Sequence, residues 1–504
     1  MEKRTICIVL SLIIASFFTT GSKGNTLQGE WNKTYGGDEY DVLYCVKETN
    51  DNGYIAVGDT LRNNVAYAWA IKTDGNGNLQ WESVDVAGSY LATYVQETDD
   101  GYIVCGWIDT GNEYNGYVWK INHEGKTEWI KEYDDVAFLY KIMLTGDGYI
   151  CIGGTKIDEN DYDGILMKVG YDGNVEWKKI YRYGYGWDVL RAISKIDGGY
   201  IMGGSCEVNG YGDFWIIKID DKGNMIWQKH YGGDKFDGIY ARDCFKTNDG
   251  GYIFGGFTFS YGKNSDVWIV KIDDNGKMIW NKTYGGSRID RLWGMDKTSD
   301  GYLLCITKNY GVYSPTADIW IVKIDENGDM LWNQTFGESG KEDRGYYIQA
   351  SSDGGYIIAA RTGPTSGNTQ GWLIKVKNVP PNKPSRPQGE ANGKINQEYT
   401  YTTSTSDSNG DEVYYMFDWG DNTTSQWIGP FKSGETINAS HTWKEEGTYK
   451  IRVKAKDANG LESPWSDYTV VSMPKRVTWK LEKLPFIYLL LKIFFPFSAF
   501  LPRM

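Results

Sequence analysis

The chain has 504 residues, which is too long for one small hydrophobic core and predicts two or more domains. Its formal net charge of −13 disfavours a nucleic-acid partner, because such a partner normally requires a basic surface. With 62 glycines, 12 prolines and 15% aromatic residues, the composition favours many short strands joined by tight turns over helices.

The N-terminus has the features of a secretory signal peptide. Lys3 and Arg4 form a basic start, residues 6–18 are largely apolar, and residues 20–22 are small enough for cleavage. The apolar run is too short for a comfortable membrane span. Residues 1–24 are therefore predicted to direct export, with the rest of the chain outside the cytoplasm.

One sequence unit of about 50 residues recurs seven times after this segment, most clearly in residues 237–286. Every unit carries three markers in the same order. The first is a tyrosine that follows glycine: Tyr54, Tyr102, Tyr149, Tyr200, Tyr252, Tyr302 and Tyr356. The second is a lysine: Lys72, Lys120, Lys168, Lys218, Lys271, Lys323 and Lys375. The third is a tryptophan: Trp31, Trp81, Trp129, Trp177, Trp227, Trp280 and Trp332.

Each unit is predicted to form four short antiparallel strands. Asp-Gly and Asn-Gly pairs between the apolar runs are strong hairpin signals, because these residues tolerate positive φ. A lone fourth strand (residues 27–34) precedes the first unit, and the last unit stops after three strands at residue 377. If the lone strand completes the last unit, the sheets close into a ring without exposed edges. Residues 25–378 are therefore predicted to form an all-β, seven-bladed β-propeller closed by the N-terminal strand.

Most of the repeated residues are interpreted as structural. The tryptophans of the fourth strands are predicted to wedge between neighbouring sheets, together with five more at one register of the third strands. The repeated lysine points to the opposite sheet face and is interpreted as a structural ion pair or a solvated side chain. The six cysteines beyond the signal region lie mostly inside apolar runs, which favours buried thiols over a disulfide framework.

Two of the four connections in each unit are long and variable, and both are predicted to lie on one face of the ring. Aromatic and acidic side chains are frequent on this variable-loop face, and they suit stacking on a sugar or contact with a protein. The candidate binding residues are Tyr183, Tyr185, Trp187, Asp188, Tyr211, Asp213, Tyr261, Asp266, Tyr310, Tyr313 and Asp318. The alternative is that the tyrosines only pack the loops and the aspartates only cap the third strands.

No catalytic residue, metal site or cofactor is predicted. Only three histidines occur, His123, His230 and His441, and they are too scattered for a histidine-based triad or a multi-histidine metal site. The acidic turns lack the spacing and the closing glutamate of an EF-hand calcium loop. Carboxylate pairs that meet only in the folded chain stay open, because a sequence does not show them.

A second domain is predicted after a stiff, proline-rich linker at residues 379–388. Alternating strands follow at residues 398–403, 412–419, 436–443, 448–457 and 466–471. The motifs FDWGDN at 417–422, SHTW at 440–443, GTY at 447–449 and DANG at 457–460 make residues 389–473 resemble a PKD domain. One departure is Trp443, where that family more often has tyrosine or phenylalanine.

The PKD resemblance implies an immunoglobulin-like β-sandwich that serves extracellular proteins as a spacer or adhesion module and has no catalytic residues. The propeller repeats, in turn, resemble those of archaeal and bacterial cell-surface proteins that often carry PKD domains. Both resemblances point to a secreted or cell-surface protein.

The C-terminal residues 474–504 include an apolar stretch, 484–502. Its leucine, isoleucine and phenylalanine residues favour membrane insertion, while Lys492 opposes it, so the sum is near balance. A membrane-spanning anchor, an interfacial anchor and a segment for surface retention or sorting are equally open. Five Asn-x-Ser/Thr sequons make Asn32, Asn281, Asn333, Asn422 and Asn438 candidates for N-glycosylation.

The expected function is non-enzymatic binding or adhesion, in which the variable-loop face recognises an extracellular glycan or protein. The alternative is an extracellular carbohydrate-active hydrolase or lyase that uses carboxylates on the same face. A quinoprotein-like dehydrogenase, suggested by Asp274-Asn275-Gly276-Lys277 before Trp280, is disfavoured because those propellers typically have eight blades.

Overall fold

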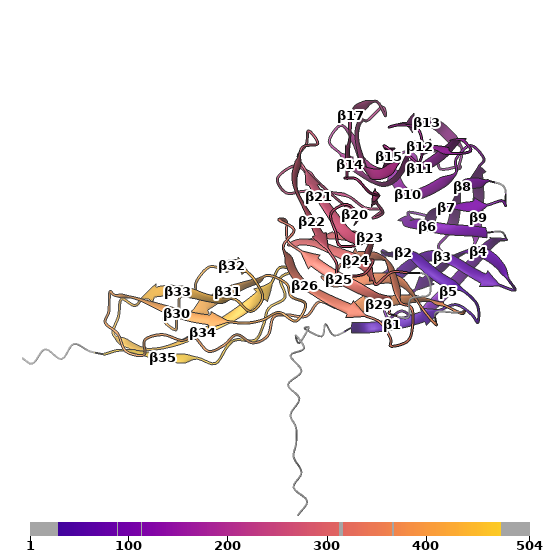
Figure 1. Cartoon of the computed structure of the whole chain (residues 1–504). Helices are drawn as coiled ribbons and strands as arrows, with labels where there is room; N and C mark the ends of the chain where they lie inside the picture. The colour runs from indigo at the N-terminus through magenta and orange to yellow at the C-terminus, as the bar shows by residue number, and fades with distance from the viewer. Residues whose placement is uncertain (1–28, 88, 112, 312–315, 365–366, 475–504) are drawn as a thin grey trace, which may run out of the picture. The chain divides into compact units, whose positions relative to one another are not determined.

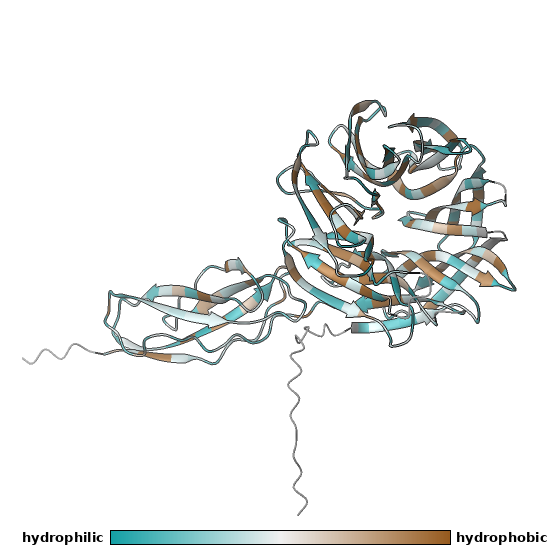
Figure 2. Cartoon of the chain, in the orientation of Figure 1, coloured by the Kyte–Doolittle hydropathy of each residue, from teal (hydrophilic) through white to brown (hydrophobic). Residues whose placement is uncertain are grey.

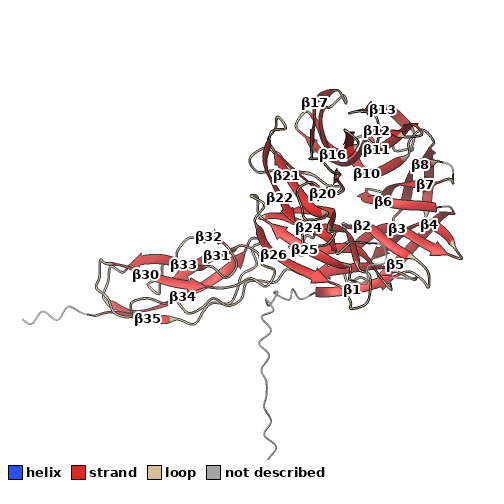
Figure 3. Cartoon of the chain, in the orientation of Figure 1, coloured by secondary structure: helices blue, strands red, loops and turns tan. Residues whose placement is uncertain are grey.

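The computed structural model describes residues 29–474 apart from 88, 112, 312–315 and 365–366. Within this range the chain contains strands and turns and no helix (Figure 3). The chain divides into two compact units, one made mainly of residues before 379 and the other mainly of residues from 379 onward. The predicted all-β fold class is confirmed at this level.

The described strands of the first unit belong to seven antiparallel sheets, which we number in chain order. Sheet 1 contains β2 (Asp41–Glu48), β3 (Tyr54–Arg62), β4 (Val65–Thr73) and β5 (Leu79–Ala87). Sheet 2 contains β6 (Ser89–Thr98), β7 (Gly101–Asp109), β8 (Tyr114–Asn122) and β9 (Thr127–Tyr133). Sheet 3 contains β10 (Phe138–Thr145), β11 (Gly148–Asp158), β12 (Asp161–Val169) and β13 (Val175–Tyr181). Sheet 4 contains β14 (Val189–Ile196), β15 (Gly199–Val208), β16 (Tyr211–Asp220) and β17 (Met225–Tyr231). Sheet 5 contains β18 (Asp237–Ile239), β19 (Phe245–Lys246), β20 (Tyr252–Thr258), β21 (Asp266–Ile272) and β22 (Met278–Tyr284). Sheet 6 contains β23 (Arg291–Thr298), β24 (Gly301–Lys308), β25 (Asp318–Ile324) and β26 (Met330–Phe336). Sheet 7 contains β27 (Arg344–Ala350), β28 (Tyr356–Thr362), β29 (Gln370–Val376) and the N-terminal strand β1 (Gly29–Tyr35).

The first strands of the sheets surround a common centre (Figure 1). Contacts run from β2 to β6, from β6 to β10, from β10 to β14 and from β14 to β19, and β27 contacts both β23 and β2. The N-terminal strand β1 pairs antiparallel with β29, with Trp31 opposite Lys375 and Thr34 opposite Trp372. The predicted pairing of the first strand with the last three is therefore confirmed, and the sheets have a propeller-like arrangement.

Neighbouring sheets are joined by a repeated contact between the fourth strand of one sheet and a hairpin turn of the next. The Trp31 indole N–H donates to the Gly75 carbonyl at 2.9 Å, and the Trp81 indole N–H donates to the His123 carbonyl at 3.0 Å. A tyrosine hydroxyl at the end of the strand donates to the carbonyl of the turn glycine in the pairs Tyr35–Gly77, Tyr133–Gly173, Tyr181–Gly223, Tyr231–Gly276 and Tyr284–Gly328. The predicted wedging of the fourth-strand tryptophans is confirmed.

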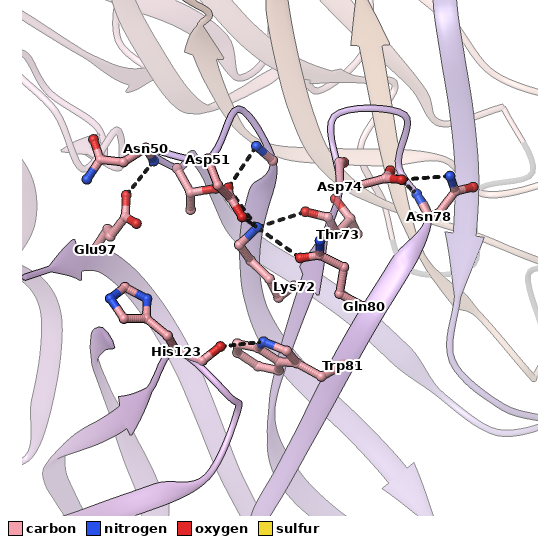
Figure 4. Close-up of polar contacts among 12 residues, drawn as sticks. Asn50, Asp51, Lys72, Thr73, Asp74, Asn78, Gln80, Trp81, Glu97 and His123 are labelled. Atoms are coloured by element: carbon pink, nitrogen blue, oxygen red, sulfur yellow. Dashed lines mark hydrogen bonds and ion pairs between the residues drawn. The ribbon is translucent and has the colours of Figure 1, made fainter. Parts of the chain in front are cut away.

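The repeated lysine is paired in every unit and buried in all except that of Lys218, which is half-buried, and this confirms the ion-pair interpretation. Figure 4 shows Lys72 within hydrogen-bond distance of Asp51, the Thr73 carbonyl and Gln80. Although burial opposes the shift, the bonds from Lys72 and Thr49 lower the pKa of Asp51 to about 2. The same lysine–aspartate pair recurs as Lys120–Asp100, Lys168–Asp147, Lys271–Asp249, Lys323–Asp300 and Lys375–Asp353, while Lys218 pairs with Asp274 of the next sheet.

Hydrophobic segments lie along the strands, while many of the connecting loops are hydrophilic (Figure 2). The six cysteines of the described residues are buried free thiols, as predicted: Cys45, Cys105, Cys151, Cys206, Cys244 and Cys305. Burial raises the pKa of Cys105 to about 12, so this thiol is neutral and packs as a small hydrophobe.

The second unit is built from two antiparallel sheets around its own core. One sheet pairs β30 (Glu398–Ser404) with β33 (Thr436–Thr442), and the other has the order β32 (Ile428–Phe431), β31 (Val413–Asp418), β34 (Gly447–Asp457), β35 (Thr469–Met473). The core includes the buried rings of Phe417, Trp419 and Trp443. Residues 382–388 run beside β30: the Ser385 N–H donates to the carbonyl of its last residue, Ser404, and the Asn382 N–H donates to the carbonyl of Ser406 just beyond it.

The predicted signal peptide (residues 1–24) and the apolar stretch at residues 484–502 both lie outside the described residues. Among the residues that the structure does describe, no helix is long and apolar enough to cross a membrane.

Candidate functional site

The first strand of each sheet faces the centre of the ring and is called an inner strand below. A β-bulge in six inner strands, β2, β6, β10, β14, β23 and β27, turns one side chain per strand out of the regular alternation. The ladder skips one residue between Leu43 and Cys45 in β2, and does so again at the matching point of the five other strands. The skipped residues are Tyr44, Thr93, Tyr140, Arg191, Trp293 and Tyr346. A bulge re-aims a side chain, and all six line one cavity of about 290 Å³, which we call the axial pocket.

The axial pocket opens among the variable loops. Its other lining residues are Leu91 and Arg344 at the start of inner strands, Trp107 and Arg361 near the end of second strands, Tyr40 and Tyr310 in loops, and Arg242. Its volume lies at the lower end of the range of about 300–1,000 Å³ that is typical of small-molecule sites. A single small chemical group, such as one sugar ring, fits this size better than a protein surface.

Four of the thirteen arginines of the chain line the axial pocket, and they have few acidic partners. Arg344 and Arg361 share one carboxylate, Glu342. Arg191 lies over the rings of Tyr140 and Tyr240, with its guanidinium carbon 4.2 Å and 4.1 Å from the ring centres. Within the described residues, no carboxylate is within ion-pair distance of Arg191 or Arg242, so positive charge dominates the pocket.

Several donors at this site are buried and lack a hydrogen-bond partner among the described residues. They are the Nε atoms of Arg191, Arg291, Arg344 and Arg361 and the indole nitrogen of Trp293. Arg291 lies just behind the pocket, with its guanidinium carbon 5.2 Å from the Tyr310 ring centre. Buried donors are nearly always paired, because an unpaired one costs about 1–3 kcal/mol. A bound group with acceptor oxygens would satisfy them.

The floor of the pocket is held by hydrogen bonds that cross the central channel. Arg242 donates to the carbonyls of Tyr44 and Thr93, at 2.9 Å and 2.7 Å, from the far side of the ring. Next to it, Asp243 accepts from Lys141 and from the Tyr347 hydroxyl, both at 2.6 Å. Although burial opposes the shift, Lys141 and the neighbouring Lys47 lower the pKa of Asp243 to about 2. Asp243 is therefore a structural anion.

A row of aromatic rings leads from the pocket toward the loops of sheets 2 to 4. We call Tyr114, Trp107, Phe138, Tyr162 and Trp187 the aromatic strip. Successive ring centres lie 5.3, 5.6, 5.8 and 4.4 Å apart. Its second ring, Trp107, also lines the axial pocket, and its last ring, Trp187, is 42% exposed. Flat rings of this kind offer faces on which a second sugar could stack.

One carboxyl group behind the pocket wall titrates near neutrality. Asp59 is buried, accepts a hydrogen bond from Tyr44 and feels the charge of Arg361. Burial is the largest influence and raises the pKa of Asp59 to about 7. Its charge next to the arginines therefore depends on pH in the neutral range.

The structure distributes the predicted binding residues over several places. Tyr310 lines the axial pocket, and Trp187 is the outer end of the aromatic strip. Tyr185 and Tyr261 are exposed on separate loops, and Tyr211 is exposed at the first position of β16. Tyr183 is half-buried and packs on His230, and Tyr313 lies outside the described residues.

The predicted aspartates mainly hold the loops. Asp188 is fully buried and accepts backbone N–H groups from Tyr183 and Gly184, at 2.7 Å and 3.0 Å. The same contact recurs at the start of other inner strands, in Asp41, Asp237, Asp290 and Asp343. Asp213 pairs with His230 and Asp266 accepts from the Lys263 N–H, whereas burial raises the pKa of Asp318.

All five sequon asparagines are exposed. Three of them also have a structural contact, because their side-chain oxygens accept the indole N–H of a third-strand tryptophan. These pairs are Asn32–Trp372, Asn281–Trp268 and Asn333–Trp320. Glu82 and Gln228 accept from Trp69 and Trp215 in the same way, so the asparagines serve packing whether or not they carry a glycan.

The sequence profile of the PKD domain family matches residues 388–470. The solved PKD domain of an M14-like peptidase from a Thermoplasmatales archaeon is 49% identical, over 19% of this chain and 99% of that domain, with a TM-score of 0.19. Residues 388–470 are a PKD domain. The predicted resemblance is thus confirmed.

Two of the PKD motifs meet inside this domain. Trp419 stacks on His441 with ring centres 4.7 Å apart, and the His441 Nε2 atom is 2.8 Å from Asp421. Trp443, where the family more often has tyrosine or phenylalanine, is fully buried. Its ring makes T-shaped contacts with the rings of Trp419 and His441. The larger ring is accommodated in the PKD core.

Other solved structures also align with this protein at low identity. A Trypanosoma rangeli sialidase aligns at 8% identity over 89% of this chain and 93% of its own, with a TM-score of 0.37. Sqt1 from Chaetomium thermophilum aligns at 11% identity over 76% and 97%, with a TM-score of 0.34. Among curated proteins, none is significantly similar to this chain.

The arginines of the axial pocket were not predicted from the sequence. Arg191 stands inside the apolar run of β14, where a regular strand gives no reason to turn it toward the centre. One signal was available: in the aligned units, the skipped position holds tyrosine, tryptophan, threonine or arginine between two buried residues. A bulky or polar residue repeated at that point indicates a position that faces the channel.

Proposed function

We propose that this is an exported cell-surface binding protein in which a seven-bladed β-propeller recognises an acidic glycan through its axial pocket. The PKD domain, which follows it in the chain, would act as a spacer or adhesion module. The proposal combines the predicted export signal, the seven four- and five-stranded sheets closed by β1, and the chemistry of the pocket.

The observation that carries the proposal is the excess of arginine in the axial pocket. Four arginines line the walls, Arg344 and Arg361 share the single carboxylate of Glu342, and several donors stay unpaired. Guanidinium groups bind carboxylates with paired hydrogen bonds, which gives both strength and orientation. A ligand that carries a carboxylate therefore fits this site better than a neutral or cationic one.

The aromatic residues favour a sugar as the carrier of that carboxylate. Tyr44, Tyr140, Trp293 and Tyr346 surround the space between the arginines, and Trp107 continues it into the aromatic strip. Sugar rings present C–H faces that pack on aromatic rings, while their hydroxyl groups accept and donate hydrogen bonds. A sugar acid thus uses both kinds of side chain in the pocket.

The test is isothermal titration of the mature chain (residues 25–504) with galacturonate oligosaccharides and with neutral galactose oligosaccharides. We expect binding of the acidic ligand only. Arg191→Gln and Arg344→Gln should each weaken it about tenfold or more, because each removes a charge-assisted contact. The double variant Arg62→Gln/Arg288→Gln changes two exposed arginines outside the pocket and should bind as the parent does.

Equal binding of acidic and neutral sugars, or no effect of the pocket variants, would contradict the proposal. The same samples should be assayed for release of reducing ends or unsaturated products. Turnover that depends on a carboxylate would favour the alternative function, a carbohydrate-active hydrolase or lyase, over binding alone.

A further inference from the structure

A second charged surface lies on the PKD domain, far along the chain from the axial pocket. Strand β34 carries a basic residue at every second position: Lys450, Arg452, Lys454 and Lys456. The residues between them, such as Ile451 and Val453, are buried in the PKD core. Because side chains alternate along a strand, the four cations all point to the outer face of the sheet.

Aromatic rings accompany these cations. Arg452 lies 4.5 Å from the ring centre of Trp465, and Lys454 lies 5.2 Å from the same ring. Lys456 lies 4.7 Å from the ring centre of Trp427. The remaining contacts join Lys454 to Trp427, Lys456 to Tyr414 and Lys450 to Tyr468, at 4.6–5.7 Å. We call these eight residues the basic-aromatic face.

The basic-aromatic face keeps an excess of positive charge. Asp418 pairs with Arg452 and Glu462 pairs with Lys454, so two of the four cations are neutralised. Lys450 and Lys456 have no carboxylate within ion-pair distance among the described residues. In a chain with a net charge of −13, a row with unpaired cations is a local exception that attracts anions.

The geometry of the face is linear. Alternate residues of a strand are about 7 Å apart, so the four cations span about 20 Å along β34. A polymer with regularly spaced negative charges can lie along such a row and neutralise several cations at once. The flanking rings of Trp465, Trp427 and Tyr468 offer stacking surfaces beside the charges.

We propose that the basic-aromatic face of the PKD domain binds a linear acidic polysaccharide along strand β34. A bilayer is favoured less, because the rings of the face lie against cations and do not stand free as apolar anchors. The site is separate from the axial pocket, and it would hold the protein on an acidic cell-envelope or extracellular polymer.

The experiment measures binding of the mature chain to immobilised polygalacturonate by surface plasmon resonance. All variants carry Arg191→Gln/Arg344→Gln, so that the axial pocket does not contribute. We expect Lys450→Gln/Lys456→Gln to weaken binding about tenfold or more, and Tyr468→Ala to weaken it about threefold. Binding should fall steeply as salt is raised, because exposed charges are screened.

The matched control is Lys394→Gln/Lys444→Gln, which removes the same charge from exposed positions next to the β30–β33 sheet. It should bind within twofold of the parent, and thermal unfolding should show that all variants are folded. The proposal is overturned if both double variants behave alike, or if carboxyl-reduced polygalacturonate binds equally well. It is also overturned if phosphatidylglycerol vesicles or duplex DNA bind more tightly through the same lysines.

Discussion

Single residues at the bulges of the inner strands line the cavity at the centre of the ring and give it its chemistry. Tyr44, Arg191 and Trp293 occupy the same structural position in different sheets, yet they give the pocket a hydroxyl, a cation and an indole. The scaffold around each of them is the same antiparallel hairpin. We therefore expect a substitution at one of these positions to change the chemistry of the pocket while the neighbouring buried residues keep the sheet intact.

We expect Asp59 to make the affinity of the axial pocket for acidic ligands depend on pH. Burial raises the pKa of Asp59 to about 7, so the group is neutral below that pH and negative above it. Lowering the pH through about 7 removes one negative charge beside Arg361, and acid binding should tighten about three- to tenfold. In Asp59→Asn this change should be absent in titrations between about pH 8 and pH 6.

The free energy of unfolding should also depend on the charge of Asp59, and like the affinity it should fall as the pH rises. Because the folded-state pKa is above the value of about 3.9 in an unfolded chain, ionisation costs more in the folded state and stability falls as pH rises from about 4 to 7. An affinity that is independent of pH in the parent protein would show that Asp59 does not influence the pocket.

At the scale of elements, the repeated turn glycines set how closely neighbouring sheets approach. Gly77 has φ +71°, and a Cβ at this position would lie 2.7 Å from the Trp31 ring of β1. The turn glycine therefore provides both a left-handed backbone and room for the tryptophan of the preceding sheet. Trp31 belongs to the strand that closes the ring, so this contact also reports on closure.

Gly77→Ala should destabilise the first unit through both effects. The left-handed backbone alone costs about 1–2 kcal/mol for a non-glycine residue, and the contact with Trp31 should add about 1–3 kcal/mol. Gly198→Ala is the matched control, because Gly198 has φ +75° and open space around its missing Cβ. Thermal unfolding of both variants measures the difference. Equal destabilisation would mean that Trp31 does not pack against this turn.

Much of this element-level structure was predictable from the sequence, because repetition and turn chemistry are local signals. The four strands per unit, the structural lysines and the pairing of β1 with the last sheet follow from the register of the repeats. The bulges were not predictable in the same way. The alternation of buried and exposed residues along a strand does not show where the pairing shifts by one residue. Within its own strand, Arg191 therefore has no sequence feature that distinguishes it from an ordinary strand residue. Nor did the sequence show that Asp51, far from Lys72 along the chain, is its partner.

At the scale of the whole molecule, the chain combines two surfaces that are positive within an acidic protein. The axial pocket is lined by four arginines, whereas the basic-aromatic face carries a row of cations along one strand. We propose a single sugar acid as the ligand of the first and an acidic polymer as the ligand of the second. Both are surrounded by aromatic rings, and both suit acidic carbohydrate. If both proposals hold, one chain carries two binding modules for acidic carbohydrate, and their joint effect depends on the span between them.

The central claim is that the axial pocket holds the carboxylate of a sugar acid, and a crystal structure of the mature chain with a galacturonate oligosaccharide tests it most directly. We predict a carboxylate about 3 Å from the guanidinium groups of Arg191 or Arg344, with the sugar ring against Trp107 or Tyr140. An oligosaccharide bound elsewhere on the first unit, with the axial pocket empty at saturating ligand, would contradict the account.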